Sequence, residues 1–120
     1  MPDKQFKIPA AAMKSLAEGR GFCYATDAIT CQGRRVGYFY REAPDSEQDS
    51  GWRFFSGTES PQELDDPAHT EIYDVNTIAN YDPEIIPLLD TPPPCAFELR
   101  GFFKKKFVAV PPPGDDDDEA

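Results

Sequence analysis

The sequence of 120 residues contains only three cysteines, one histidine and one tryptophan, and it has no long apolar run. Three cysteines without a C-x-x-C pair argue against a disulfide framework and a zinc site, so we expect Cys23 and Cys95 to be small buried hydrophobes. No stretch approaches the roughly 18 apolar residues that cross a bilayer, and the first residues lack the apolar centre of a signal peptide. We therefore expect a cytosolic protein.

Familiar catalytic signatures are also missing, because the sequence contains no P-loop, no G-x-S-x-G and no G-x-G-x-x-G. His69 falls in a proline-punctuated stretch that we predict to be an exposed loop, which makes it a poor candidate for catalysis. The adjacent carboxylates Asp65 and Asp66 could exchange protons with a substrate, but such pairs in loops are more often simply solvated. These observations favour a protein that is not an enzyme and needs no cofactor.

One short stretch partly matches a calcium-binding pattern. Asp45, Glu47 and Asp49 have the one-three-five spacing of an EF-hand loop. The rest of that pattern fails, because Gly51 stands at position seven instead of six and Ser56 stands where a bidentate glutamate belongs. We predict no regular metal site, and a weak, irregular cation site in this loop stays open.

Acidic residues are concentrated in the middle of the chain, whose formal net charge is −10. Residues 42–98 carry fourteen acidic residues and a single cation, Arg53, whereas residues 1–41 and residues 99–110 each have a net charge of +4. Such a field disfavours nucleic acid, whose binding relies on cations that contact phosphates. It would attract a basic protein and speed its association. The alternative is an acidic surface with no function beyond solubility.

Short segments separated by glycine and proline predict a single α+β domain over residues 1–110, followed by a disordered, acidic, proline-rich tail over residues 111–120. We expect an N-terminal helix over residues 8–21, an antiparallel sheet of about four to five strands and short covering helices. The expected strands cover 22–26, 34–43, 52–57 and one or two segments within 95–110. A long polar hairpin loop then separates the second strand from the third.

Aromatic residues alternate with others along the second predicted strand. Val36, Tyr38 and Tyr40 fall on one of its faces, and Phe39 and Arg41 fall on the other. The sheet should therefore have one side that faces the core and one side that is partly solvated.

Two short helices are expected after residue 74. Asp74 can cap the first, from Val75 to Asn80, and Asp82 can cap the second, in which Pro83 suits the first position. Pro87 should keep the second helix brief or kinked. The expected apolar anchors of these helices on the sheet are Ile78, Ile85, Ile86, Leu88 and Leu89.

Four segments between Gly21 and Glu98 together carry a family resemblance. They read GFCYA, VGYFYRE, DSGWRFFSG and YDVNTIANYDPEIIPLLD, and they resemble a bacterial family grouped with the immunity proteins, as number thirty-three, of polymorphic toxin systems. The resemblance implies a cytosolic α+β domain that binds and neutralises a toxin without catalysis of its own. The acidic middle of the chain fits that role, since a carboxylate-rich face can occupy the basic groove of a nuclease toxin.

With that resemblance, we take the acidic residues of the middle segment and its one tryptophan as candidate partner contacts. They are Asp45, Glu47, Asp49, Trp52, Asp65, Asp66, Asp74 and Asp82. For Asp74 and Asp82 the alternative role is helix capping, and for Trp52, which shares a strand face with Phe54, it is a place in the core.

Two other functions stay open from the sequence. One is a stand-alone regulatory or scaffold module with an unknown partner, and the other is a metal-dependent hydrolase that uses clustered carboxylates. A deep pocket lined by convergent carboxylates would favour the enzyme, whereas a broad acidic face with an exposed aromatic side chain would favour protein binding.

Overall fold

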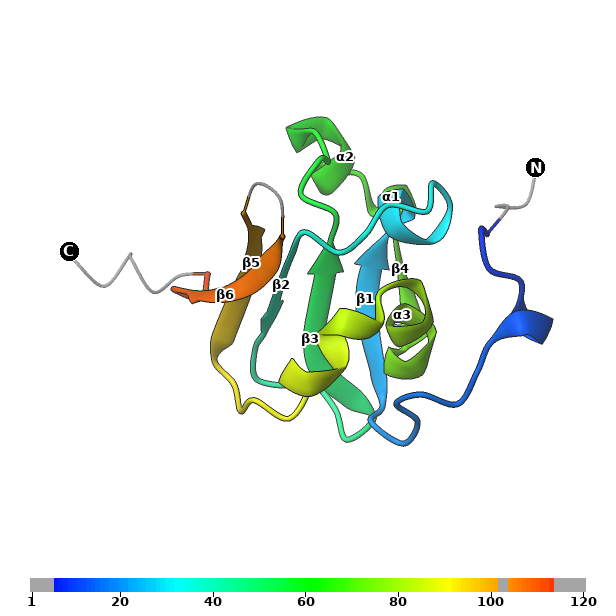
Figure 1. The fold of residues 1–120 in the computed structure, drawn as a ribbon, viewed down its shortest axis with the longest axis horizontal. Coiled ribbons are helices and arrows are strands. Elements are labelled where there is room, and N and C mark those ends of the chain that lie inside the picture. The colour runs from blue at the N-terminus through cyan, green and yellow to red at the C-terminus, as the bar shows by residue number, and fades with distance from the viewer. Residues whose placement is uncertain (1–5, 102–103, 114–120) are drawn as a thin grey trace.

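A computed structural model describes residues 6–101 and 104–113 of the chain, and its centre is a six-stranded mixed sheet of order β4-β1-β3-β2-β5-β6 (Figure 1). The strands are β1 (Phe22–Thr26), β2 (Tyr38–Arg41), β3 (Asp49–Phe55), β4 (Thr70–Asp74), β5 (Cys95–Arg100) and β6 (Lys106–Val110). β1 runs parallel to β3, and the other four neighbouring pairs are antiparallel. The α+β class is confirmed, but the sheet is neither wholly antiparallel nor limited to five strands.

The unpredicted strand is β4, which pairs with β1 at one edge of the sheet. Its residues are mostly exposed, and the side chain of Ile72 is 55% exposed. An edge strand with so little buried surface needs no regular apolar alternation, so the usual sequence signal for a strand is missing.

The helices are short. They comprise α1 (Asp27–Thr30), α2 (Pro61–Asp65) and α3 (Val75–Tyr81), with 3-10 segments η1 (Ala10–Ala12), η2 (Pro67–His69) and η3 (Pro83–Leu88). Both predicted caps are confirmed, because the carboxylate of Asp74 accepts from the Asn76 N–H at 2.8 Å and that of Asp82 accepts from the Glu84 N–H at 3.2 Å. η3 contains Pro87 and stays in the 3-10 form, in keeping with the expected brief helix. No helix within the described ranges is long and apolar enough to cross a membrane.

The predicted N-terminal helix over residues 8–21 is wrong, because only η1 forms there. The side chain of Asn76 on α3 takes the backbone groups that a helix would use: its Oδ1 accepts from the N–H groups of Leu16 and Ala17 at 2.7 and 2.8 Å. Its Nδ2 donates to the Lys14 carbonyl at 2.8 Å, and Asn80 bonds the Lys14 N–H at 2.9 Å. The segment therefore lies as an irregular strap against α3.

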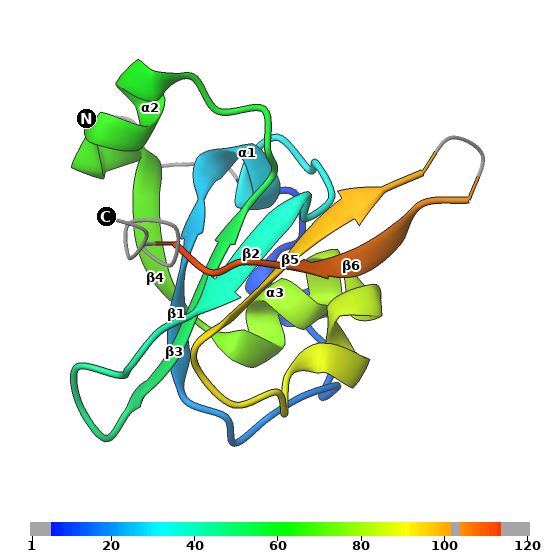
Figure 2. The ribbon, with the colours of Figure 1, turned by 90° about the vertical axis from the view of Figure 1, so that its left-hand side faces the viewer.

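α3 and η3 cover one face of the sheet, where the core lies (Figure 2). The ring of Phe39 lies at its centre, with its centroid 5.3 Å from those of Trp52, Phe54 and Phe97. The expected helix anchors are confirmed, since Ile78, Ile85 and Leu89 are buried and Ile86 and Leu88 pack against the same cluster. Of the three free cysteines, Cys23 is buried, and Cys31 and Cys95 are partly buried.

α3 and η3 do not cover the opposite face of the sheet, which we call the open face (Figure 2). Because Phe39 points into the core, its neighbours Tyr38 and Tyr40 on β2 point to the open face, where both are half-buried. Val36, which we grouped with these tyrosines, lies before β2 and is fully buried. The chain leaves β6 into the predicted disordered tail, of which residues 114–120 lie outside the described ranges.

A candidate partner-binding surface

The β2–β3 loop, residues 42–48, extends beyond one end of the sheet (Figure 2). Glu42, Asp45 and Glu47 are exposed on it. Backbone hydrogen bonds fix its base, because the Glu42 N–H donates to the Gly51 carbonyl at 3.0 Å and the Phe22 N–H donates to the Gln48 carbonyl at 2.8 Å. These hydrogen bonds connect both ends of the acidic loop to the sheet.

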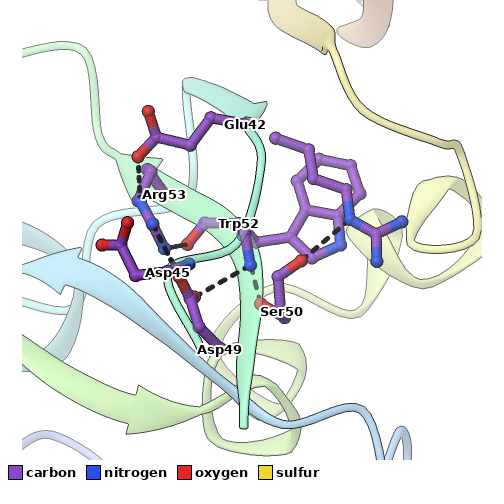
Figure 3. Close-up of polar contacts among 8 residues, drawn as sticks. Glu42, Asp45, Asp49, Ser50, Trp52 and Arg53 are labelled. Carbon is purple, nitrogen blue, oxygen red and sulfur yellow. Dashed lines mark hydrogen bonds and ion pairs between the residues drawn. The ribbon is translucent and has the colours of Figure 1, made fainter. Parts of the chain in front are cut away.

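Asp49, at the start of β3, is a structural clamp under this loop and not a free anion (Figure 3). Its two carboxylate oxygens accept from Nη1 and Nη2 of Arg53 at 2.9 and 3.0 Å, and from the backbone N–H groups of Asp45 and Gly51, each at 2.9 Å. These hydrogen bonds, above all those from Arg53, hold the pKa of Asp49 well below its usual range. The buried carboxylate therefore anchors the loop and offers nothing to a partner.

Arg53 completes the clamp from the middle of β3. Its Nε donates to a Glu42 carboxylate oxygen at 2.7 Å, and its guanidinium lies 4.5 Å from the ring centroid of Tyr24. The side chain is only 6% exposed, so the single cation of residues 42–98 is used inside the fold. Within the part of the chain that the structure describes, neither Asp45 nor Glu47 has an ion-pair partner.

Trp52 is also interior, which agrees with the core alternative and not with a contact role. The residue is 1% exposed, and its indole Nε1 donates to the Leu89 carbonyl at 3.3 Å. The guanidinium of Arg41 lies 5.4 Å from the indole ring and donates to the carbonyls of Ser50 and Thr91. Trp52 thereby ties β3 to the end of η3.

Asp74 and Asp82 act as helix caps, but they differ in exposure. Asp74 is exposed and lies at the loop end of the sheet, because Phe22 of β1 pairs with Asp74 on one side and with Asp49 on the other. Asp82 is 4% exposed; it accepts from the Val36 N–H at 3.2 Å and pairs with Arg35. Only Asp74 therefore remains accessible as a contact.

Asp65 and Asp66 are exposed, but they lie with α2 and η2 at the other end of the sheet (Figure 2). Asp66 caps η2, and His69 lies between Asp66 and Asp27 with a nitrogen-to-oxygen distance of 3.7 Å to each. The eight predicted contacts are thus not one face: Asp45, Glu47 and Asp74 gather at the loop end, two lie far from them, and three are buried.

A shallow groove lies beside the acidic loop and was not anticipated. It has a volume of about 380 Å³ and runs between the loop and the β4 edge. Its lining residues are Gly21, Phe22, Gln48, Ile72, Tyr73 and Asp74. Together with the acidic loop it forms what we call the loop-end surface, in which exposed apolar and acidic groups adjoin, as in protein-binding sites.

Among the described residues, no group of three or more His, Cys, Asp or Glu side chains is placed to hold a metal ion. In comparisons with known proteins, residues 23–110 match the Immunity protein Imm33 domain. The chain belongs to the Imm33 family. No curated protein and no solved structure matches it.

The Imm33 match begins within β1 and ends with the last residue of β6, so it contains all six strands apart from the first residue of β1, together with the acidic loop and α3. It leaves out the strap that Asn76 holds. The family gives this protein an immunity role, and the resemblance read from four sequence segments is confirmed.

The sequence contained a signal for the Asp49–Arg53 pair that we missed. Residues four apart on a strand point to the same face, about 13 Å apart. The residue between them on that face is Gly51, which has no side chain, so the long side chain of Arg53 can reach back to Asp49. A carboxylate paired in this way is not available to a partner.

Proposed function

We propose that this Imm33 protein acts in the cytosol as a non-catalytic inhibitor that binds a basic toxin through its loop-end surface. The observation that carries the proposal is the asymmetry of charge around the clamp. Arg53 is consumed by Asp49 and Glu42, whereas Asp45 and Glu47 stay exposed on a loop that the same clamp holds in place. The carboxylates of Asp45 and Glu47 are therefore already held in an exposed arrangement before a partner binds.

Electrostatic complementarity of this kind acts mainly on the rate of association. Carboxylates on a protruding loop raise the local concentration of a cationic partner, and the effect falls as salt shortens the Debye length from about 10 Å at 0.1 M to about 3 Å at 1 M. The adjoining Phe22 and Ile72 supply the apolar contact that slows dissociation, because Ile72 is 55% exposed. Substitution of the acidic residues should thus change mainly the association rate, and substitution of the apolar residues should change mainly the dissociation rate.

The proposal is tested with toxins encoded beside the gene. Co-expression should restore growth, and the purified pair should form a stoichiometric complex. The double variant Asp45→Lys/Glu47→Lys should then slow association about tenfold at low salt, with a smaller effect at high salt. Asp49 must be kept, since a lysine there would face Arg53 and break the clamp.

A matched control is Glu18→Lys/Asp65→Lys, which changes the net charge by the same amount at exposed positions outside the loop-end surface. If both variants slow association equally, total charge and not the loop is responsible. Failure of the wild-type protein to bind or protect against any neighbouring toxin would reject the proposed function itself.

A further inference from the structure

A second hollow lies on the open face of the sheet, towards α2, and the proposed function does not use it. It has a volume of about 270 Å³, and its lining residues are Tyr38, Tyr40, Phe55, Gly57, Glu59 and Leu64. We call it the aromatic groove. Its floor is three rings from β2 and β3, whose centroids are 6.0 Å apart in each of the three pairs.

The walls of the aromatic groove are fixed by hydrogen bonds. Glu59 accepts from the N–H groups of Ser56 and Gly57 at 2.8 and 3.0 Å, and from the hydroxyl of Thr26. α2, which carries Leu64, begins with a capping box between Ser60 and Glu63. Leu64 is nevertheless 49% exposed, so an apolar side chain stands at the rim without a described partner covering it.

The charged residue that lines this groove is Glu59. Burial would raise the pKa of Glu59, but its hydrogen bonds lower the pKa below its ordinary value, so the carboxylate stays ionised. Glu42, which follows Tyr40 on the same strand face, does not add a free charge, because its carboxylate pairs with Arg53. Arg53 projects from the same face as Tyr40, its partner across β2 and β3, but it is only 5% exposed and already binds Asp49 and Glu42.

Aromatic rings beside carboxylates form an environment that favours a cation with an apolar stem. The faces of tyrosine and phenylalanine attract a guanidinium or an ammonium group, and a neighbouring carboxylate pairs with it. Arginine fits better than lysine, because its planar group stacks on rings and is more weakly hydrated. A purely apolar occupant would remove water from the Glu59 carboxylate without bringing a cation to it.

We infer that the aromatic groove binds an arginine side chain of the toxin, as a second contact separate from the loop-end surface. The inference rests on the proposed function for the nature of the partner, and it adds the chemistry of one residue on that partner. The aromatic groove lies beside α2 and the loop-end surface includes the β2–β3 loop. These two elements are at opposite ends of the sheet (Figure 2), so a toxin that meets both contacts must span the sheet.

The first test is a titration of the full chain with the peptide Ac-Gly-Arg-Gly-NH2, followed by the NMR signals of the Gly57 amide and the rings of Tyr38, Tyr40 and Phe55. Saturable shifts of these signals are expected. The same peptide with citrulline in place of arginine keeps the shape but loses the charge, and it should give no saturable shift. Equal shifts with the two peptides, or none with either, would overturn the inference.

The second test uses Leu64→Arg, which places a guanidinium at the rim of the groove, where it competes with that of the partner. Leu16→Arg is the matched control, since Leu16 is 42% exposed and lies in the strap, away from the groove. Leu64→Arg should abolish the peptide shifts and weaken toxin binding about tenfold, whereas Leu16→Arg should do neither. Tyr40→Leu, which keeps an apolar side chain but removes a ring, should weaken both as well.

These outcomes separate the two proposals. Unchanged toxin affinity in Leu64→Arg and Tyr40→Leu would overturn the aromatic groove and leave the loop-end surface standing. If the wild-type chain binds no neighbouring toxin, the proposed function fails and the groove loses its partner with it. Thermal melting of each variant, expected near that of the wild type for Leu64→Arg, checks that a loss of binding is not a loss of folding.

Discussion

Replacing Asp49 by asparagine tests the clamp that holds the acidic loop. The substitution keeps the shape but removes the charge, and it turns one acceptor oxygen into an N–H donor that faces Arg53 or a backbone N–H group. Removing one partner from a buried pair costs about 3–5 kcal/mol, because the other charge is left uncompensated. Arg53 keeps its bond to Glu42 and its contact with Tyr24, so we expect about 3 kcal/mol.

The assay is urea unfolding at pH 7, followed through the fluorescence of the buried Trp52. A loss of about 3 kcal/mol is a large part of the 5–15 kcal/mol that holds a typical domain, and it should lower the melting temperature by about 10 °C. Asp45→Asn, at an exposed position of the same loop, is the matched control and should change stability by less than about 0.5 kcal/mol.

The contribution of Asp49 to stability should also depend on pH in a defined direction. The folded state holds the pKa of Asp49 below its unfolded value of about 3.9, so the carboxylate stabilises the fold above that pH. Its contribution is lost as the pH falls from about 4 towards the lower pKa of the folded state. The stability gap between the wild type and Asp49→Asn should narrow in that window. A gap under about 1 kcal/mol at pH 7, or one that stays constant below pH 4, would refute the clamp.

Two further predictions concern other parts of the fold. Asn76→Ala removes three hydrogen bonds to the strap, and it should lower the free energy of unfolding by about 2–3 kcal/mol. It should also speed proteolysis near Lys14, and Thr77→Ala on the same helix is the control. Burial raises the pKa of the Cys23 thiol, so little of the reactive thiolate forms at pH 8. A thiol reagent at this pH should modify the partly buried Cys31 first and should react with Cys23 only when the protein unfolds. Rapid labelling of Cys23 in the native protein would contradict its burial.

Features set by neighbouring residues were predictable from the sequence. The β2–β3 hairpin follows from alternation on either side of a polar loop, and its strands pair from Tyr38 with Phe55 to Arg41 with Trp52. The caps at Asp74 and Asp82 follow from the preference of carboxylates for free N–H groups at helix starts. In each case the stabilising contact lies within the same short segment.

Features set by residues far apart in the chain were not predictable in this way. The parallel pairing of β1 with β3 joins residues about 30 positions apart, and no local pattern specifies it. The strap stays irregular because Asn76, 60 positions away from Leu16, satisfies its backbone. The same holds for the candidate site, since acidic composition does not distinguish the exposed Asp45 from the clamped Asp49.

The hydrogen bonds of Asn76 to the strap bear on which amino acids the strap can contain. The amide side chain bonds only main-chain atoms of Lys14, Leu16 and Ala17, so it does not distinguish one amino acid from another there. Many residues can therefore occupy the exposed position 16 without loss of these hydrogen bonds, whereas the buried position of Ala17 in the core leaves little room for a larger side chain. Proline suits neither position, since it has no N–H to give.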